Sequence, residues 1–220
     1  MSFQALVASP LGEILLTADE AGLTGLYFTD QRDCPHLPGV AAAGDVISRP
    51  SAGTREGRQT RRFKAVPAAD GELFPATRAS GTPDAAGQGA APRFLQAGLP
   101  AHAQAVLEQT CRELDEYWRR QRRVFDVPLN PHGTGFQQRV WQALLEVPCG
   151  ATLSYGELAL RAGLGAGHGR AVGTAVGSNP ISIIIPCHRI LARDGTLNGY
   201  GGGLDRKIRL LEIEGFAIRA

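Results

Sequence analysis

The sequence lacks several features that would place a protein in a class at once. Its four cysteines are scattered and form no Cys-x-x-Cys pair, so neither a disulfide framework nor a cysteine-rich zinc site is indicated. It also lacks a basic amino-terminal segment followed by an unbroken apolar run, and no apolar stretch is long enough to span a bilayer. We therefore expect a soluble, cytoplasmic protein without a membrane partner.

A strong charge of either sign is lacking as well. The formal net charge is only +2, which does not by itself indicate a nucleic-acid partner. Residues 131–220 carry a mild excess of Lys and Arg but no polybasic run. Such a surface can contact phosphates, and an ordinary solvated face fits it equally well.

The first 130 residues contain two stretches of ordered pattern with a different composition between them. Short apolar patches broken by turn-like sequences predict two or three strands of a small antiparallel sheet over 3–28. Residues 39–100 are rich in Ala, Gly and Pro, which predicts a largely disordered insert. An amphipathic helix is predicted over 101–121. Its apolar stripe consists of Leu107, Cys111, Leu114 and Trp118. We expect an amino-terminal sheet-plus-helix domain over 1–130.

Residues 131–220 predict a second, mainly helical domain, so the fold class is α/β of the α+β type. Thr134 with Gln137, and Ser154 with Glu157, form capping-box patterns that mark two helix starts. The buried face predicted for the first of these helices is Phe136, Val140, Trp141, Leu144 and Leu145. The second helix leads through a glycine-rich turn into another, a helix-turn-helix arrangement of winged-helix-like type.

The helix predicted over 170–179 has an unusual share of small side chains. They are Ala171, Gly173, Thr174, Ala175 and Gly177. Glycine inside a helix costs roughly 1 kcal/mol relative to alanine, so two glycines indicate that something large approaches the backbone. Packing against another helix would explain them. A nucleic-acid groove is the sharper alternative, and Arg170 would then lie at the duplex.

The segment Ser-Ile-Ile-Ile-Pro-Cys-His-Arg-Ile-Leu, residues 182–191, carries the reactive side chains. We predict a buried strand that Pro186 ends, a rigid mount for the thiol of Cys187. Neighbours on an extended chain point to opposite faces, so His188 is expected to reach Cys187 through a bridging water. Burial alone would make the thiol inert, so its reactivity requires such an activator.

A histidine in this role needs a carboxylate that holds its tautomer, and Glu214 is the candidate. It lies in the last turn of a helix whose packed face we expect at Leu204, Ile208 and Leu211. The helix dipole disfavours an anion there, and a cationic His188 nearby would offset that cost. The alternative is an ordinary exposed glutamate, and composition does not separate the two.

These segments resemble the O6-alkylguanine-DNA alkyltransferases, also called methylated-DNA–protein-cysteine methyltransferases. The Pro-Cys-His-Arg core followed by the Tyr-x-Gly-Gly loop at Tyr200 carries the resemblance, which covers essentially all of 131–220. Residues 1–30 and 105–121 match loosely, and the insert does not match. The resemblance implies a monomeric DNA-repair enzyme that needs no cofactor. It would transfer an alkyl group, such as methyl, from O6 of guanine, and from O4 of thymine, irreversibly to Cys187, acting once.

The resemblance also implies roles for individual residues. Cys187 would accept the alkyl group, with His188 as its activator through water and Glu214 behind the histidine. Asn179 would order the turn before the active-site segment. Tyr155 would supply a proton at N3 of the leaving guanine.

Binding of double-stranded DNA through the minor groove, with the damaged base flipped out, is implied as well. Arg170 would fill the gap left by the base, above the small residues Ala171, Gly173 and Thr174. The carbonyls of Cys187 and Ile190 would read the exocyclic amine of guanine. Gly201, directly after Tyr200, would offer its N–H to O6.

Two departures from the family pattern accompany the match. The spacing from Tyr155 to Arg170 is one residue longer than expected, which we place in the turn between the helices. Some relatives bind zinc, but Cys34 and His36 lack a complete ligand set, so no metal is predicted.

Two other functions also fit a cysteine beside a histidine. A cysteine hydrolase normally mounts its nucleophile at a helix start beside an oxyanion hole. A lesion-binding protein without chemistry would lack the nucleophile that this chain has.

Overall fold

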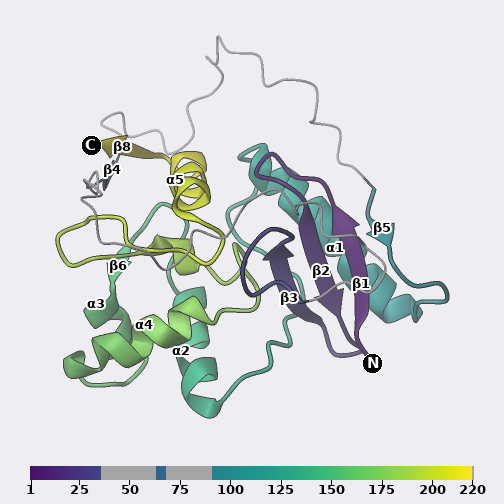
Figure 1. Ribbon diagram of the computed structural model, residues 1–220, viewed down its shortest axis with the longest axis horizontal. Coiled ribbons are helices and arrows are strands. Elements are labelled where there is room, and N and C mark those ends of the chain that lie inside the picture. Colours follow the sequence, from purple (N-terminus) through teal and green to yellow (C-terminus); the bar gives the residue numbers. More distant parts are fainter. Residues whose placement is uncertain (36–62, 68–90, 220) are drawn as a thin grey trace, which may run out of the picture.

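The structure of the chain is a computed structural model that describes residues 1–35, 63–67 and 91–219 (Figure 1). It is a mixed α/β fold, as predicted. The strands are β1 (Phe3–Val7), β2 (Ile14–Ala18), β3 (Leu23–Phe28), β4 (Lys64–Pro67), β5 (Arg93–Phe94), β6 (Leu153–Ser154), β7 (Ile190–Leu191) and β8 (Phe216–Arg219). The α-helices are α1 (Ala101–Trp118), α2 (Gly135–Leu145), α3 (Tyr155–Arg161), α4 (Gly169–Gly177) and α5 (Leu204–Ile213).

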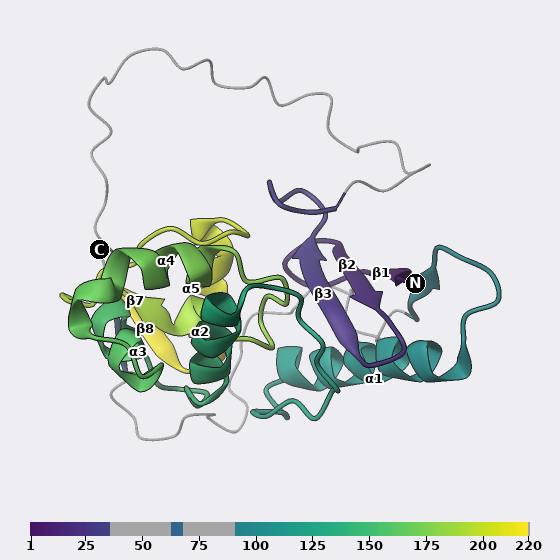
Figure 2. The same ribbon diagram turned by 90° about the horizontal axis from the view of Figure 1, so that it is seen from below.

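The amino-terminal half is an antiparallel sheet with one helix against it. The strand order is β3-β2-β1-β5, and the register pairs Ala5 with Leu16 and Leu16 with Leu26. Helix α1 runs along one face of this sheet (Figure 2). Every residue of β2 is buried, because this strand lies between β3 and β1 and packs against α1. The predicted sheet and helix are confirmed.

The prediction of disorder over 39–100 is wrong at two places. Lys64–Pro67 pairs with the carboxy-terminal strand β8, and Arg93–Phe94 pairs with β1. The average composition of 39–100 does not reveal these two strands, because each is short and is stabilised by a partner strand far away in the sequence. The rest of the predicted insert lies largely outside the described residues.

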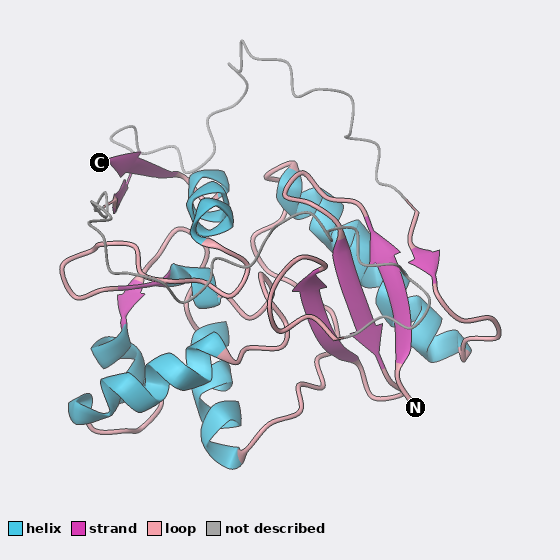
Figure 3. Ribbon diagram, in the orientation of Figure 1, coloured by secondary structure: helices cyan, strands magenta, loops and turns pink. Residues whose placement is uncertain are grey.

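The carboxy-terminal half contains helices α2 to α5 (Figure 3). Both predicted capping boxes are present, with reciprocal hydrogen bonds between side chain and backbone. The indole N–H of Trp141 donates to the carbonyl of Ala175 at 2.8 Å and joins α2 to α4. Leu145 is 39 % exposed, so its prediction as a core residue is wrong, and Ala143 takes the buried place.

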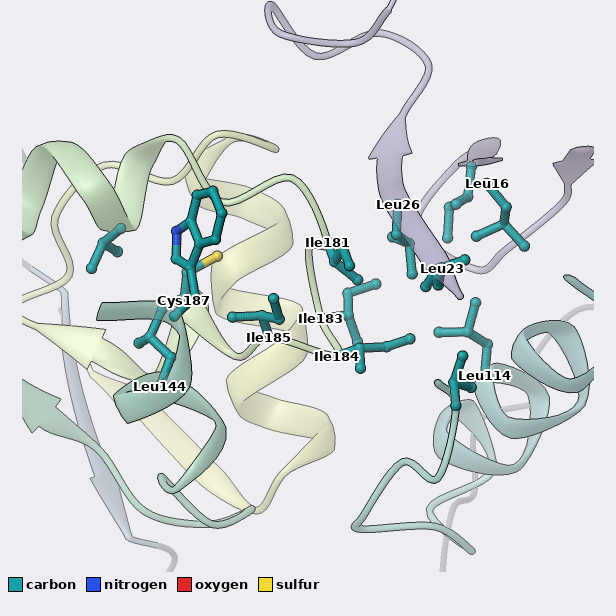
Figure 4. Packing of buried hydrophobic residues seen from close by; sticks show 14 of the residues in the cluster. Leu16, Leu23, Leu26, Leu114, Leu144, Ile181, Ile183, Ile184, Ile185 and Cys187 are labelled. Atoms are coloured by element: carbon teal, nitrogen blue, oxygen red, sulfur yellow. The ribbon is translucent and has the colours of Figure 1, made fainter. Parts of the chain in front are cut away.

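One hydrophobic cluster continues from the sheet into the helical half. Figure 4 shows Ile181, Ile183 and Ile184 between Leu23 and Leu26 of β3 on one side and the Cys187 region on the other. The segment before Cys187 therefore packs against both halves at once. Within the described residues, no helix combines the length and apolar character needed to cross a bilayer.

Candidate active site

The segment before Cys187 is a tight turn, so the predicted strand over 182–185 is wrong. The N–H of Ile185 donates to the carbonyl of Ile181 at 3.0 Å, and Ile183 has a φ of 73°. A positive φ at a β-branched residue costs about 1–3 kcal/mol and persists only where packing enforces it. The enforcing contact comes from β3, since Leu26 exchanges backbone hydrogen bonds with Pro180 and Ser182.

The turn places Cys187 at the start of a short 3-10 helix, Cys187–Arg189. Its thiol is 7 % exposed, and its Sγ accepts a hydrogen bond from Nδ2 of Asn179 at 3.1 Å. Asn179 also donates to the carbonyl of Ile185 and accepts from the N–H of Ile181, so it holds the turn together. Burial raises the pKa of Cys187, while the Asn179 hydrogen bond and the charge of Lys207 oppose that rise. The thiol therefore needs a base to ionise near neutral pH.

His188 is the histidine directly after Cys187, and it is fully buried. Its Nε2 lies 2.9 Å from Oε1 of Glu214, and both side chains are buried. Burial alone would raise the pKa of Glu214, but His188 and Arg189 outweigh it and hold that pKa well below its usual value. An ionised carboxylate only accepts, so the proton between the two groups belongs to Nε2. Nδ1 is then an acceptor, and it has no hydrogen-bond partner among the described residues.

Two further side chains that the sequence-based interpretation missed complete this cluster. Arg189 donates from Nε and Nη2 to the two carboxylate oxygens of Glu214, at 2.9 and 2.8 Å. Tyr117, on α1, donates its hydroxyl to Oε1 at 2.9 Å. Tyr117 lies beside the predicted apolar stripe, and a buried tyrosine hydroxyl normally seeks a partner, which was the available signal. We call Tyr117, His188, Arg189 and Glu214 the carboxylate cluster.

The carboxylate cluster makes the stability of the protein depend on pH. The folded-state pKa of Glu214 lies below 4.5, so its contribution is fully present above that pH and lost as the pH falls. Burial also lowers the pKa of His188 below 6.5, despite the opposing charge of Glu214, so its contribution has the same sign and is lost on acidification from 6.5. We expect the free energy of unfolding, measured in urea, to decrease steadily from about pH 7 to about pH 4.

Glu214→Gln is the variant that tests the assignment of this slope. The decline of unfolding free energy below pH 4.5 should be smaller in the variant, because a glutamine does not titrate. An equally steep decline in both proteins would contradict the assignment.

A cavity of about 590 Å³ opens in front of the thiol. Among its lining residues are those predicted around the base: Tyr155, Gly173, Thr174, Asn179, Cys187, Tyr200 and Gly201. Tyr27 and Gln31, which the sequence-based interpretation did not single out, contribute a wall from the amino-terminal half. Burial raises the pKa of Tyr155, and the charge of Cys187 adds to this effect, so its hydroxyl stays protonated and can donate.

Three of the residues predicted to contact DNA or the base lie outside the cavity lining. Arg170 and Ala171 are exposed at the amino-terminal end of α4. Ile190 is buried in β7, and its carbonyl accepts from Nζ of Lys207 at 2.6 Å. The carbonyl of Cys187 accepts from the N–H of Ile190. Since a carbonyl oxygen has two lone pairs, reading of guanine by these two groups stays a prediction.

Helix α4 contains two glycines, Gly173 and Gly177, that no close contact within the described residues explains. A Cβ added at Gly177 would meet no atom within 4 Å, and at Gly173 it would stand 3.7 Å from the ring of Tyr155, an ordinary contact. Helix–helix packing therefore does not require either glycine among the described residues.

The described residues contain no group of three or more His, Cys, Asp or Glu side chains arranged to hold a metal ion. Cys34 belongs to that part of the chain, whereas His36 lies outside it.

Comparison with known proteins agrees with this geometry. A family profile described as "6-O-methylguanine DNA methyltransferase, DNA binding domain" matches residues 135–216. The methylated-DNA–protein-cysteine methyltransferase of Mycobacterium tuberculosis is 54 % identical over 102 residues, 46 % of this chain and 61 % of that protein. The protein of the same name from Haemophilus influenzae is 61 % identical over 89 residues, 40 % of this chain and 49 % of that protein. These alignments thus span less than two thirds of the curated relatives.

The structural match extends further along the chain. The crystal structure of Mycobacterium tuberculosis O6-methylguanine methyltransferase superimposes with a TM-score of 0.61 at 33 % identity, covering 98 % of this chain and 93 % of that one. The structure of the Mycobacterium tuberculosis protein in complex with DNA gives a TM-score of 0.60, covering 96 % and 91 %. This chain, with its turn at Cys187 and the cavity in front of that residue, therefore belongs to the methylated-DNA–protein-cysteine methyltransferase family.

Proposed function

We propose that this protein repairs alkylated DNA by transferring the alkyl group from O6 of guanine, and from O4 of thymine, to its own Cys187. One observation carries the proposal: the Cys187 thiol faces a cavity while His188 and Glu214 lie behind it as a buried proton acceptor. No cofactor has a role in this chemistry. The product is a thioether, which none of the side chains at the site can cleave, so each molecule acts once.

The activation step follows from the tautomer of His188. Nε2 carries a proton toward Glu214, so Nδ1 is free to take the thiol proton, through a bridging water. The imidazolium that forms is stabilised by the ionised Glu214. The hydrogen bond from Asn179 remains on the sulfur and favours its anionic form.

The transfer step is a nucleophilic displacement at the alkyl carbon. The Cys187 thiolate attacks the alkyl carbon in line, forming the S–C bond as the bond from carbon to O6 breaks. The electron pair of that bond passes to the guanine, which takes up a proton at N3 from Tyr155. Tyr155 suits this role because its hydroxyl is protonated and its ring lines the cavity.

The cavity can receive a base only after that base has left the stack, which costs a few kcal/mol. We propose that α4 enters the minor groove, where Ala171, Gly173 and Thr174 let the backbone approach closely. Arg170, exposed at the start of α4, fills the gap left by the flipped base. Every residue of the site belongs to one chain, so a monomer suffices.

Two domains divide this work in the proposal. Residues 131–220 bind DNA and accept the alkyl group, and residues 1–130 support them. One such supporting contact is the backbone hydrogen bonding of Leu26, on β3, to the turn before Cys187.

The test uses a molar excess of duplex DNA with a single O6-methylguanine, together with an unmethylated duplex as control. We expect O6-methylguanine to disappear until about one equivalent per protein is consumed and then to stop, because the thiolate is used up. Tight binding without loss of the lesion would identify a lesion-binding protein. Continued turnover, or ester hydrolysis without DNA, would identify a hydrolase; each of these outcomes rejects the proposal.

Arg170→Ala tests the gap-filling role. We expect the repair rate on methylated duplex to fall by about tenfold or more, since the unfilled stack lets the base return. Reaction with the free base O6-methylguanine should change much less. The matched control is Arg209→Ala, because Arg209 is an exposed arginine on α5, and it should leave both rates unchanged. Equal losses on duplex and free base would reject the role.

A further inference from the structure

Strand β4 comes from the segment 39–100, which the family resemblance does not cover, yet it reaches the half of the molecule that carries Cys187. It pairs antiparallel with β8, and the register places Lys64 opposite Arg219 (Figure 1). On its other edge, Lys64 forms an antiparallel bridge with Thr196. β4 therefore lies between the carboxy-terminal strand and the loop that follows β7.

The loop 192–203, between β7 and α5, carries one wall of the cavity. Gly199, Tyr200 and Gly201 line the cavity in front of Cys187. A loop holds such residues in a precise place only where the backbone on both sides of them is fixed by surrounding structure. The contacts that fix this loop therefore decide the shape of the cavity.

The second half of the loop is fixed by elements outside 39–100. The N–H of Gly203 donates to the carbonyl of Tyr200 at 2.9 Å. The guanidinium of Arg206, on α5, donates to the carbonyl of Gly202 at 2.9 Å. A Cβ added at Gly202 would stand 2.9 Å from the ring of Phe28, so β3 packs directly against this backbone. These contacts hold the part of the loop that follows Tyr200.

The first half of the loop is fixed by β4. The N–H of Leu197 donates to the carbonyl of Phe63 at 2.9 Å. This bond lies next to the bridge between Lys64 and Thr196. The turn before it closes on itself, because the N–H and the hydroxyl of Thr196 both donate to Oδ1 of Asp194, at 3.1 and 2.6 Å. β4 thus ties a self-contained turn to β8, directly before the residues that line the cavity.

An apolar cluster keeps β4 in this place. Two paired strands are at best marginally stable in water unless they pack against other elements. Six side chains supply that packing: Leu191, Leu211 and Phe216 at the centre, with Ala65, Leu197 and Ile218 against them. Ala65 of β4 and Leu197 of the loop thus enter the same cluster, so side-chain packing and backbone hydrogen bonds act together.

Helix α5 supplies a further contact to the loop. Leu211 confirms part of the packed face predicted for this helix. That prediction is otherwise partly wrong, because Leu204 and Ile208 are only half-buried. Lys207 takes a buried place instead, and its Nζ donates to the carbonyl of Asn198 at 3.2 Å. The loop therefore keeps one contact to α5 when β4 is removed.

We propose that β4 is a positioning element for alkyl transfer, which holds the loop 192–203 so that the cavity keeps the shape that receives the flipped base. The inference rests on the proposed function, because it assigns a strand of the insert a part in that reaction. Lys64, Ala65 and Val66 do not line the cavity themselves, so β4 acts through the loop.

The test detaches β4 with Ala65→Asp. A carboxylate at this position enters the apolar cluster without a partner, so the strand should leave it. The Leu197 amide reports the detachment, because its acceptor is the carbonyl of Phe63. We expect this amide to exchange its hydrogen about tenfold faster or more in the variant. The Gly195 amide, which donates to Ala192 within the turn, should keep its rate.

Two reactions of Cys187 then separate positioning from general damage. Alkyl uptake from O6-methylguanine, in duplex and as the free base, should slow by about tenfold, because a displaced wall misplaces the base in either form. The loss is partial because Lys207 still holds Asn198. Iodoacetamide needs no base-shaped cavity, so its labelling of Cys187, followed by peptide mass spectrometry, should change by less than about twofold.

Lys64→Asp is the matched control. It places the same carboxylate on the same strand, but the side chain of Lys64 is exposed, so the Leu197 exchange rate and uptake from the free base should match the wild type. Wild-type alkyl uptake in Ala65→Asp would overturn the inference, and so would a wild-type exchange rate at Leu197. Equal losses of alkyl uptake and iodoacetamide labelling would show general damage and would also overturn it.

If Ala65→Asp does not fold, the coupling is measured from the other side. A strand that holds the cavity in shape for the base must itself be held more firmly when the base is bound, by the same factor. Exchange of the Leu197 amide is measured in Cys187→Ser with and without saturating O6-methylguanine base. We expect exchange to slow by about tenfold, and an unchanged rate in the base-bound protein overturns the inference.

The wild-type protein keeps the two proposals apart. Its failure to take up a methyl group from a lesion-bearing duplex would reject the proposed function. Normal uptake by the wild type, with no difference between Ala65→Asp and Lys64→Asp, would reject the role of β4 alone.

Discussion

Cys187→Ser is expected to abolish alkyl uptake completely while leaving DNA binding intact. A serine hydroxyl at neutral pH is a far weaker nucleophile than a thiol whose proton His188 can take. The side chains are close in size, and Asn179 can still donate to the new oxygen, so the turn should keep its shape. Loss of O6-methylguanine from a duplex measures the reaction, and fluorescence anisotropy with the same duplex measures binding.

The matched control is Cys111→Ser. Cys111 is half-buried on α1, where burial raises its pKa to about 12, so it is an inert thiol and its replacement should leave repair unchanged. Repair that survives Cys187→Ser would show that another group accepts the alkyl. Loss of DNA binding in that variant would show that Cys187 is structural.

Glu214→Gln is expected to have the second largest effect, on both rate and stability. The amide leaves Arg189 buried without its anion, and breaking such a buried pair costs about 3–5 kcal/mol. It also presents an N–H donor toward His188 and Arg189, so the tautomer that leaves Nδ1 free is no longer enforced. Because general-base assistance contributes about a hundredfold or more, we expect a loss of repair rate of that order.

Urea denaturation and the repair rate are measured on the same preparation of this variant. Glu212→Gln is the control, because Glu212 lies at the same end of α5 but pairs with the exposed Arg209. It should change neither quantity by much. A Glu214→Gln protein as stable and as fast as the wild type would refute the carboxylate cluster as described.

Local signals predicted part of this structure well. The capping boxes at Thr134 and Ser154 gave the starts of α2 and α3, because a cap depends on residues three positions apart. The family resemblance indicated Cys187, His188 and Glu214, and the structure brings the last two into contact. Their roles in catalysis stay predictions.

Other features depend on contacts that no local pattern contains. Three isoleucines favour a strand, but the backbone of Leu26 and the two packed halves impose a turn with Ile183 at positive φ. Tyr117 reaches Glu214 across 97 residues, and the buried Lys207 contradicts the usual exposure of lysine. Such contacts become visible only when the chain is folded.

The most direct test of the central claim is the mass of the protein after exposure to a duplex that contains O6-methylguanine. We expect a gain of about 14 Da, one methylene, in every molecule that has reacted. Digestion should place that gain on the peptide containing Cys187. An unchanged mass after the lesion has been consumed, or a gain on Cys34, Cys111 or Cys149 instead, would contradict the claim that Cys187 accepts the alkyl group.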